Sequence, residues 1–191
     1  MKYYPIHVKL DRKKVVVIGG GQVALRKVKE LLEVGAKTHV IAKIPVKALK
    51  KMASKKKIIL SSRPYRKGDL KDAVLAIAAT EDREVNQAVT QEAEQRRIFM
   101  NVVDKTEYCS FITPAIVRRG DLVLTVSTSG VLPALARKIR EDLEKIFGPE
   151  YGPYLKKLGQ IRKNLIRRNV QDRSHLLNEL VRQEMRQGIK A

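Results

Sequence analysis

A glycine-rich segment that directly follows an apolar run constrains this chain more than any other feature. The run is 15–18, and the segment reads Gly19-Gly20-Gly21-Gln22-Val23-Ala24. The pattern G-x-G-x-x-G/A between a strand and a helix is typical of dinucleotide binding, because its glycines allow a tight turn and a close approach of the backbone to a pyrophosphate. Apolar residues recur at helical spacing over 23–34, so we expect a helix to begin at the glycine segment. The N–H groups of its first turn would be free to bind the pyrophosphate. We predict a nicotinamide-cofactor site that includes Gly19, Gly21, Gln22 and Val23.

The second half of this dinucleotide fingerprint departs from the usual pattern. An acidic residue normally follows the next strand, about 20 residues on, and binds the ribose hydroxyls. After the expected strand 37–42, this chain has Lys43 and Ile44 instead. One interpretation is an NADP site in which Lys43 faces the 2′-phosphate. The other is an NAD site that holds the ribose through backbone groups near Lys43 and Ile44.

The first part of the chain alternates between strand and helix patterns. Further strands are expected at 57–61, 73–79 and 98–103, and further helices at 46–53 and 83–97. A continuous apolar run such as 73–79 is typical of a parallel strand buried on both faces. The alternation predicts a Rossmann-type, doubly wound α/β sheet, which binds ligands at the carboxyl ends of its strands. Ala79, Thr80 and Asp104 lie at such ends.

The pattern changes after Asp104. Strand-like runs at 111–118 and 122–127 predict a hairpin, and a helix begins at Pro133, a residue suited to the first helical position. A hairpin with one helix leaves apolar faces that a second copy of the chain would cover. We therefore expect a homodimer.

Three parts follow from this pattern. A dinucleotide-binding domain spans 1–110, and a small α+β dimerisation segment spans 111–148. Two helices, 154–169 and 174–188, form a C-terminal helical segment over 149–191.

Composition narrows the range of functions. The 40 Lys and Arg against 20 Asp and Glu give a net charge of +20, which attracts polyanions. The chain has no Trp, and only 5% of its residues are aromatic. Proteins that bind single-stranded nucleic acid interleave cations with aromatic side chains that stack on the bases, so this composition argues against nucleic acid as the partner. The lone Cys109 allows no internal disulfide, and no cluster of ligand residues indicates a metal site. Without an apolar membrane span or a signal peptide, we expect a cytoplasmic protein.

Five motifs in register resemble the precorrin-2 dehydrogenase family, which includes the dehydrogenase part of siroheme synthases. The motifs are the glycine segment with Arg26-Lys27, the segment 76–80 with Asn86, the segments 101–104 and 111–114, and the segment 126–130 leading to 133–137. The resemblance implies NAD-dependent oxidation of precorrin-2 to sirohydrochlorin, followed in some members by insertion of ferrous iron. It favours NAD over NADP as the cofactor, and it implies an intertwined homodimer.

The resemblance also suggests roles for single residues. Asp104 matches the family's functional aspartate and would accept the proton lost as hydride leaves precorrin-2; the competing role is to cap the turn that follows it. Ser127 and Thr128 would line the tetrapyrrole cleft, or would only cap the turn before Pro133. The family commonly has a serine where this chain has Leu132, which removes an N-cap worth about 1 kcal/mol unless Thr128 or a neighbour replaces it.

Two other classes of protein fit parts of the sequence. A basic nucleic-acid-binding protein would explain the charge but leave the glycine segment without a role. An NAD-sensing regulatory module would explain the fold without catalysis.

Overall fold

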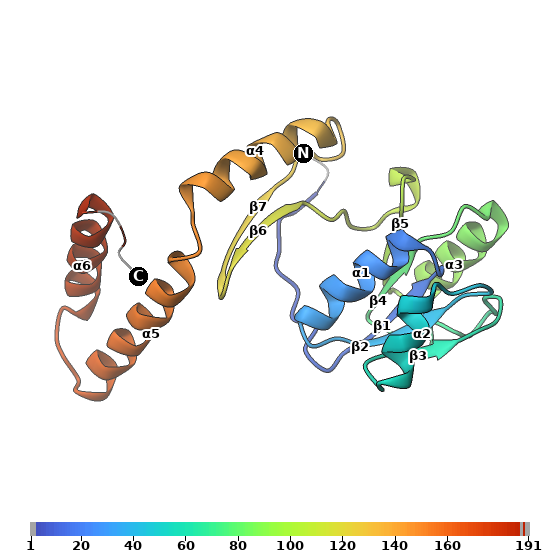
Figure 1. Ribbon diagram of the computed structural model, residues 1–191, viewed down its shortest axis with the longest axis horizontal. Coiled ribbons are helices and arrows are strands. Elements are labelled where there is room, and N and C mark those ends of the chain that lie inside the picture. The colour runs from blue at the N-terminus through green and yellow to red at the C-terminus, as the bar shows by residue number, and fades with distance from the viewer. Residues whose placement is uncertain (1–2, 188, 190–191) are drawn as a thin grey trace. The chain divides into compact units, whose positions relative to one another are not determined.

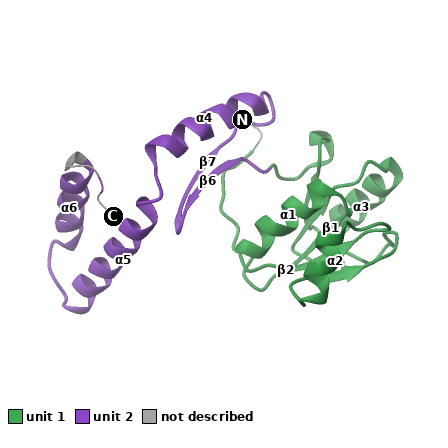
Figure 2. Cartoon of the chain, viewed as in Figure 1, with its two compact units in different colours: residues 1–112 green, residues 113–191 purple. Residues whose placement is uncertain are grey.

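The computed structural model describes residues 3–187 and 189, and it divides the chain into two compact units, 1–112 and 113–191 (Figure 1, Figure 2). Unit 1 holds a sheet of five parallel strands in the order β3-β2-β1-β4-β5. The strands are β1 (Lys14–Ile18), β2 (Lys37–Ile41), β3 (Ile59–Ser61), β4 (Leu75–Ala78) and β5 (Phe99–Val102). The helices are α1 (Gln22–Glu33), α2 (Lys47–Ser54), α3 (Arg83–Gln95) and the short 3-10 helix η1 (Thr106–Tyr108). The predicted Rossmann-type fold is confirmed.

Helices cover both faces of the sheet, which explains why its central strands are apolar throughout. Alternate side chains of β1 point to opposite faces. Val15 and Val17 belong to the core that packs against α1 and α2, whereas Val16 and Ile18 belong to the core that packs against α3. All four side chains are buried. Such a sheet leaves only its ends open to ligands.

The strand order reverses at β1, which has β2 on one side and β4 on the other. Loops that leave the carboxyl ends of β1 and β4 therefore turn toward opposite faces and leave a crevice between them, the usual ligand site of such sheets.

Unit 2 consists of a hairpin and three helices. The antiparallel pair β6 (Ala115–Arg119) and β7 (Leu122–Val126) packs against α4 (Pro133–Ile146). Arg119 fixes the hairpin to the end of α4, because its guanidinium donates to the carbonyls of Phe147 and Glu144. The remaining helices are α5 (Tyr151–Arg167) and α6 (Arg173–Gln187), which pack against each other. No helix among the described residues is long and apolar enough to cross a membrane.

Several predicted boundaries need correction. The strand expected from Phe111 begins only at Ala115, because Phe111 belongs to unit 1: its ring packs edge-on against Phe99, and its carbonyl accepts a hydrogen bond from the Asn101 side chain at 3.1 Å. The last helix ends within the described residues at Gln187, and its expected final residue, Gly188, lies outside them.

The N-terminus of α4 lacks a side-chain cap, as the sequence indicates. Thr128 Oγ1 accepts a hydrogen bond from the N–H of Leu132, the N-cap residue itself, at 3.2 Å. The Thr128 hydroxyl therefore braces the turn before the helix and leaves the N–H groups of the first helical turn without a side-chain partner.

A buried carboxylate anchors α3 to the segment between β3 and β4. The side chain of Glu92 is 2% exposed and accepts hydrogen bonds from Tyr65 Oη, Gly68 N and Arg96 Nε. Burial alone would raise the pKa of Glu92, but these three donors outweigh it and hold the pKa below its ordinary value.

We expect Glu92→Gln to lower the free energy of unfolding by about 1–3 kcal/mol at neutral pH, because at least one buried donor loses its acceptor. A depressed pKa stabilises the fold above the unfolded-state pKa, and this contribution disappears as pH falls through the folded-state pKa. The variant should therefore lose less stability on acidification than the parent. Urea unfolding at several pH values measures both effects. Glu94→Gln on the exposed side of α3 is the control, and equal stability of the two variants would contradict this account.

Candidate active site

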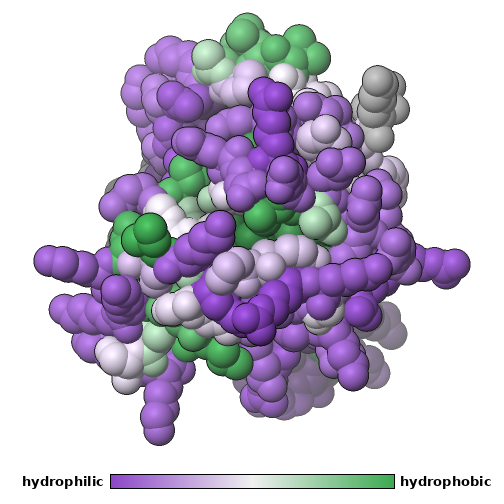
Figure 3. Space-filling model, turned by 90° about the vertical axis from the view of Figure 1, so that its right-hand side faces the viewer, coloured by the Kyte–Doolittle hydropathy of each residue, from purple (hydrophilic) through white to green (hydrophobic). Residues whose placement is uncertain are grey.

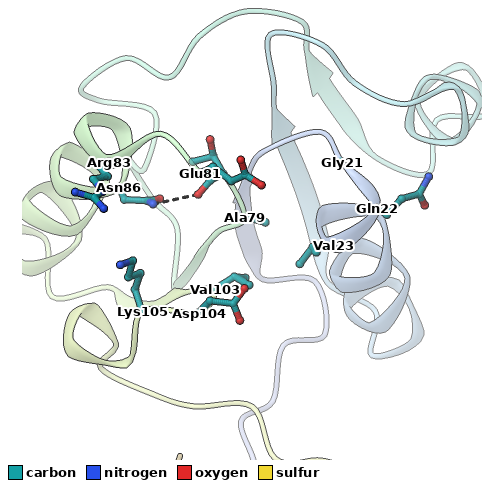
Figure 4. Close-up of a pocket in the computed structure, with 11 residues that line it drawn as sticks. Gly21, Gln22, Val23, Ala79, Glu81, Arg83, Asn86, Val103, Asp104 and Lys105 are labelled. Carbon is teal, nitrogen blue, oxygen red and sulfur yellow. Dashed lines mark hydrogen bonds between the residues drawn. The ribbon is translucent and has the colours of Figure 1, made fainter.

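A pocket of about 480 Å³ lies at the carboxyl edge of the sheet of unit 1 (Figure 4). Its walls come from the start of α1, the end of β4, the start of α3 and the segment after β5. The lining residues are Gly21, Gln22, Val23, Ala79, Thr80, Glu81, Arg83, Asn86, Val103, Asp104 and Lys105. The pocket therefore occupies the crevice that the strand order creates.

The three consecutive glycines have different physical reasons to be glycine. Gly19 has φ +122°, and a Cβ there would lie 2.1 Å from the carbonyl oxygen of Ala79. A Cβ on Gly20 would lie 2.8 Å from the Cβ of Ala42 and from the carbonyl of Ile44. Gly19 and Gly20 are thus required by the fold itself.

Gly21 differs, because a Cβ there would meet no atom within 4 Å. It is the N-cap of α1, it lines the pocket, and no side chain caps the helix. The space beside Gly21 and the free N–H groups of the first turn form a cradle for an anion such as a pyrophosphate. This arrangement fits a dinucleotide.

Asp104 stands on the opposite wall, beyond the end of β5. Figure 4 shows it across the pocket from Val23. Its backbone has φ +60°, a region that Asp and Asn enter more readily than other side chains. The side chain is exposed and makes no hydrogen bond within the described residues, so the turn-capping role finds no support there. A carboxylate without internal partners is available to a ligand.

The segment that carries Asp104 is pinned at its base. The Cys109 thiol lies 3.2 Å from the N–H of Val102, 3.3 Å from its carbonyl and 3.2 Å from the carbonyl of Lys105. Ser110 then bonds to the backbone of Met100 on β5. Burial raises the pKa of the Cys109 thiol, which keeps it protonated. Cys109 therefore has a structural role, holding this segment against the end of β5, and is not expected to act as a nucleophile.

The structure gathers most of the predicted site residues. Six of them line the pocket: Gly21, Gln22, Val23, Ala79, Thr80 and Asp104. Gly19, Lys43 and Ile44 do not, although Ile44 contributes a carbonyl to the packing around Gly20. Ser127 and Thr128 belong to unit 2, and their binding roles stay predictions.

Sequence reasoning assigned no role to five pocket residues: Glu81, Arg83, Asn86, Val103 and Lys105. Asn86 was identified only as part of a family motif. Arg83 lies three residues before it on the same face of the first turn of α3, and this i, i+3 spacing was the available signal for Arg83. Lys105 and Val103 flank Asp104. Within residues 3–187 and 189, no group of three or more His, Cys, Asp or Glu side chains is placed to hold a metal ion.

Comparisons with known proteins agree with this geometry. A family model described as "Putative NAD(P)-binding" matches residues 6–115. The siroheme synthase of Pseudoalteromonas translucida (strain TAC 125) is 39% identical over 168 residues, which cover 88% of this chain and 36% of the relative. That of Sodalis glossinidius (strain morsitans) is 41% identical over 153 residues, which cover 80% and 32%. The chain spans about a third of the length of these two relatives.

A solved structure of SirC, precorrin-2 dehydrogenase, superposes with a TM-score of 0.82 at 27% identity and covers 98% of this chain and 94% of SirC. Fold, glycine segment and family model together define a Rossmann-fold protein of an NAD(P)-binding class. Within that class, the chain belongs to the family that includes precorrin-2 dehydrogenase and siroheme synthases.

We expect Gly21→Val to abolish dinucleotide binding while the protein still folds, because the new side chain enters the space left for the pyrophosphate and its Cβ meets no protein atom within 4 Å. Calorimetric titration with NAD and a thermal melt of the same sample measure the two effects. Gly159→Ala, which also meets open space but lies in α5, is the control and should bind NAD normally. Unchanged NAD affinity in Gly21→Val would show that the cradle is not the phosphate site.

Proposed function

We propose that the protein is an NAD-dependent precorrin-2 dehydrogenase that converts precorrin-2 to sirohydrochlorin. The observation that carries the proposal is that the open cradle beside Gly21 and the free carboxylate of Asp104 line one pocket. The similarity to SirC along nearly the whole of both chains supports the same reaction.

The reaction removes two electrons and two protons from precorrin-2. NAD, when bound, accepts the two electrons and one proton as hydride. The hydride would leave a ring-bridging carbon, and the second proton, lost from the macrocycle as the hydride leaves, needs an acceptor near the cofactor. Asp104 supplies that acceptor in our proposal, and its exposure to the pocket lets the proton pass on to solvent.

Charge assists substrate capture. Precorrin-2 is a polycarboxylate, and a protein with a net charge of +20 concentrates such an anion around itself. Hydrophilic side chains cover most of the face shown in Figure 3, and apolar patches lie between them. Arg83 and Lys105 bring cations to the pocket itself, within reach of substrate carboxylates.

We expect Asp104→Asn to bind NAD normally and to lose about 10²–10⁴-fold in the rate of precorrin-2 oxidation, because the amide cannot accept a proton at neutral pH. Asn is the right replacement, since it keeps the shape and tolerates the left-handed backbone at φ +60°. Asp104→Ala adds backbone strain to the lost carboxylate and should also melt at a lower temperature.

The control for this experiment is Glu107→Gln, which removes an exposed carboxylate of the same segment from outside the pocket. It should turn over precorrin-2 at the parent rate in an absorbance assay with NAD. A parent rate in Asp104→Asn would assign that residue a structural role and send the proton to another group.

Lys43 tests the choice of cofactor. We propose NAD, although a lysine follows β2 where an acidic residue is usual. Steady-state kinetics should give a higher kcat/KM with NAD than with NADP. Lys43→Ala should change this ratio little, because backbone groups near Lys43 and Ile44, rather than the exposed Lys43 side chain, would hold the ribose of NAD. A preference for NADP that Lys43→Ala removes would reverse the assignment.

Insertion of ferrous iron into the product is a second candidate activity, favoured by the siroheme synthase relatives. Iron would enter as a substrate, and the carboxylate that accepts the proton from precorrin-2 could also receive the pyrrole protons. The rate at which the purified protein inserts ferrous iron into the product should then fall in Asp104→Asn, together with the rate of precorrin-2 oxidation. Loss of oxidation alone would separate the two reactions.

Assembly is proposed to rest on the predicted dimerisation segment 111–148, of which unit 2 holds 113–148. The helix α4 and the turn before it expose Val131, Leu132, Leu135 and Ile139, of which Val131 is 85% exposed. We expect a homodimer by light scattering at micromolar concentration, because an isologous contact would cover this apolar face. Leu135→Glu combined with Ile139→Glu should give a monomer, whereas Arg137→Glu on another side of α4 should not. A monomeric parent would contradict the proposal.

A further inference from the structure

One buried polar atom at the pocket lacks a partner. Among the described residues, two buried side-chain oxygens accept or donate no hydrogen bond, Asn86 Oδ1 and Tyr154 Oη. Tyr154 lies in α5, whereas Asn86 lines the pocket from the first turn of α3 and is only 6% exposed. Buried acceptors without donors are rare and costly, so the oxygen of Asn86 requires an explanation.

The orientation of this amide is fixed by its other end. Asn86 Nδ2 donates to the carbonyl oxygen of Thr80 at 3.1 Å, as the dashed line in Figure 4 shows. Reversing the amide would place two oxygens against each other, so only this orientation is chemically consistent. Asn86 thus braces the loop after β4 with its nitrogen, and its oxygen stays an acceptor without a donor.

The pocket geometry indicates where a donor would come from. A pyrophosphate at the start of α1 has the segment 42–45 on one side, packed against Gly20, and the end of β4 with α3 on the other. The family fingerprint places the adenosine ribose after the second strand, beside that segment. The nicotinamide half therefore extends toward Thr80 and Asn86.

We propose that Asn86 Oδ1 accepts a hydrogen bond from the nicotinamide half of the bound dinucleotide. This inference rests on the proposed cofactor. That half offers two kinds of donor, the hydroxyls of its ribose and the NH2 of its carboxamide. Oδ1 is buried, and rotation about the terminal torsion of Asn, which is soft, would bring it to the pocket. Asn86 would then fix the ring relative to Asp104 on the facing wall.

Asn86→Ala tests the inference through binding rather than turnover. Calorimetry with the purified protein compares NAD, ADP-ribose and ADP. We expect about a tenfold weaker Kd for NAD, as for one lost hydrogen bond, and an unchanged Kd for ADP, which lacks the nicotinamide half. Weaker binding of ADP-ribose as well would identify a ribose hydroxyl as the donor, and unchanged binding would identify the carboxamide.

Thr90→Val is the matched control, because Thr90 is a buried polar residue one turn further along α3, and within the described part of the chain its hydroxyl bonds only to the Asn86 carbonyl. It should leave all three affinities unchanged. Equal weakening of NAD and ADP in Asn86→Ala would show a merely structural role, and unchanged NAD affinity would also overturn the inference.

A second measurement uses the parent protein and needs no variant to fold. The side-chain 13Cγ resonance of Asn86 should shift on addition of NAD and stay in place on addition of ADP. Identical responses to the two ligands would overturn the inference. A parent that binds NAD but does not oxidise precorrin-2 would refute the proposed reaction and leave the role of Asn86 open to these same tests, so the two failures are distinguishable.

Discussion

The close approach of Gly19 to the carbonyl of Ala79 is the constraint on which the site depends. No side chain fits between the loop after β1 and the end of β4, because a Cβ would lie 2.1 Å from that oxygen. The contact holds the loop after β1 against the end of β4, beside the crevice where the strand order reverses. It also directs the chain into α1 at Gly21, where free N–H groups face the pocket. Fold and site are therefore specified by the same few atoms.

Two fixed walls follow from that contact. One is the start of α1, and the other is the loop after β4 with the first turn of α3, braced by the bond from Asn86 to Thr80. At its other end, α3 is held by the buried carboxylate of Glu92. The helix α3 thus joins pocket and core, because its first turn faces the ligand and its later turns are anchored in the core. Rigid support of this kind keeps reactive groups within the small tolerances that catalysis requires.

The sequence was sufficient for the elements whose signal is local. The glycines after β1 predicted three of the eleven pocket residues, Gly21, Gln22 and Val23, and the alternation of strand and helix patterns predicted the fold, because turn geometry and burial depend on neighbouring residues. Asn86 and Lys105 were assigned no role, since their importance arises from packing between segments distant in sequence. The prediction that the hairpin begins at Phe111 was wrong for the same reason. An aromatic residue is typical of a strand, but the Phe111 ring packs against Phe99 instead of extending the hairpin.

The left-handed backbone at Asp104 limits how this site can change. Few residues other than Asp, Asn and Gly adopt such a conformation at low cost, so most replacements of Asp104 would disturb the loop as well as remove the carboxylate. The substitution by Asn is an exception, because it keeps both the backbone and the cradle for the cofactor. On the proposed role of Asp104, a single amide in place of its carboxylate would leave a folded dinucleotide receptor without the oxidation step, and a sensor would then lie one substitution away from this site.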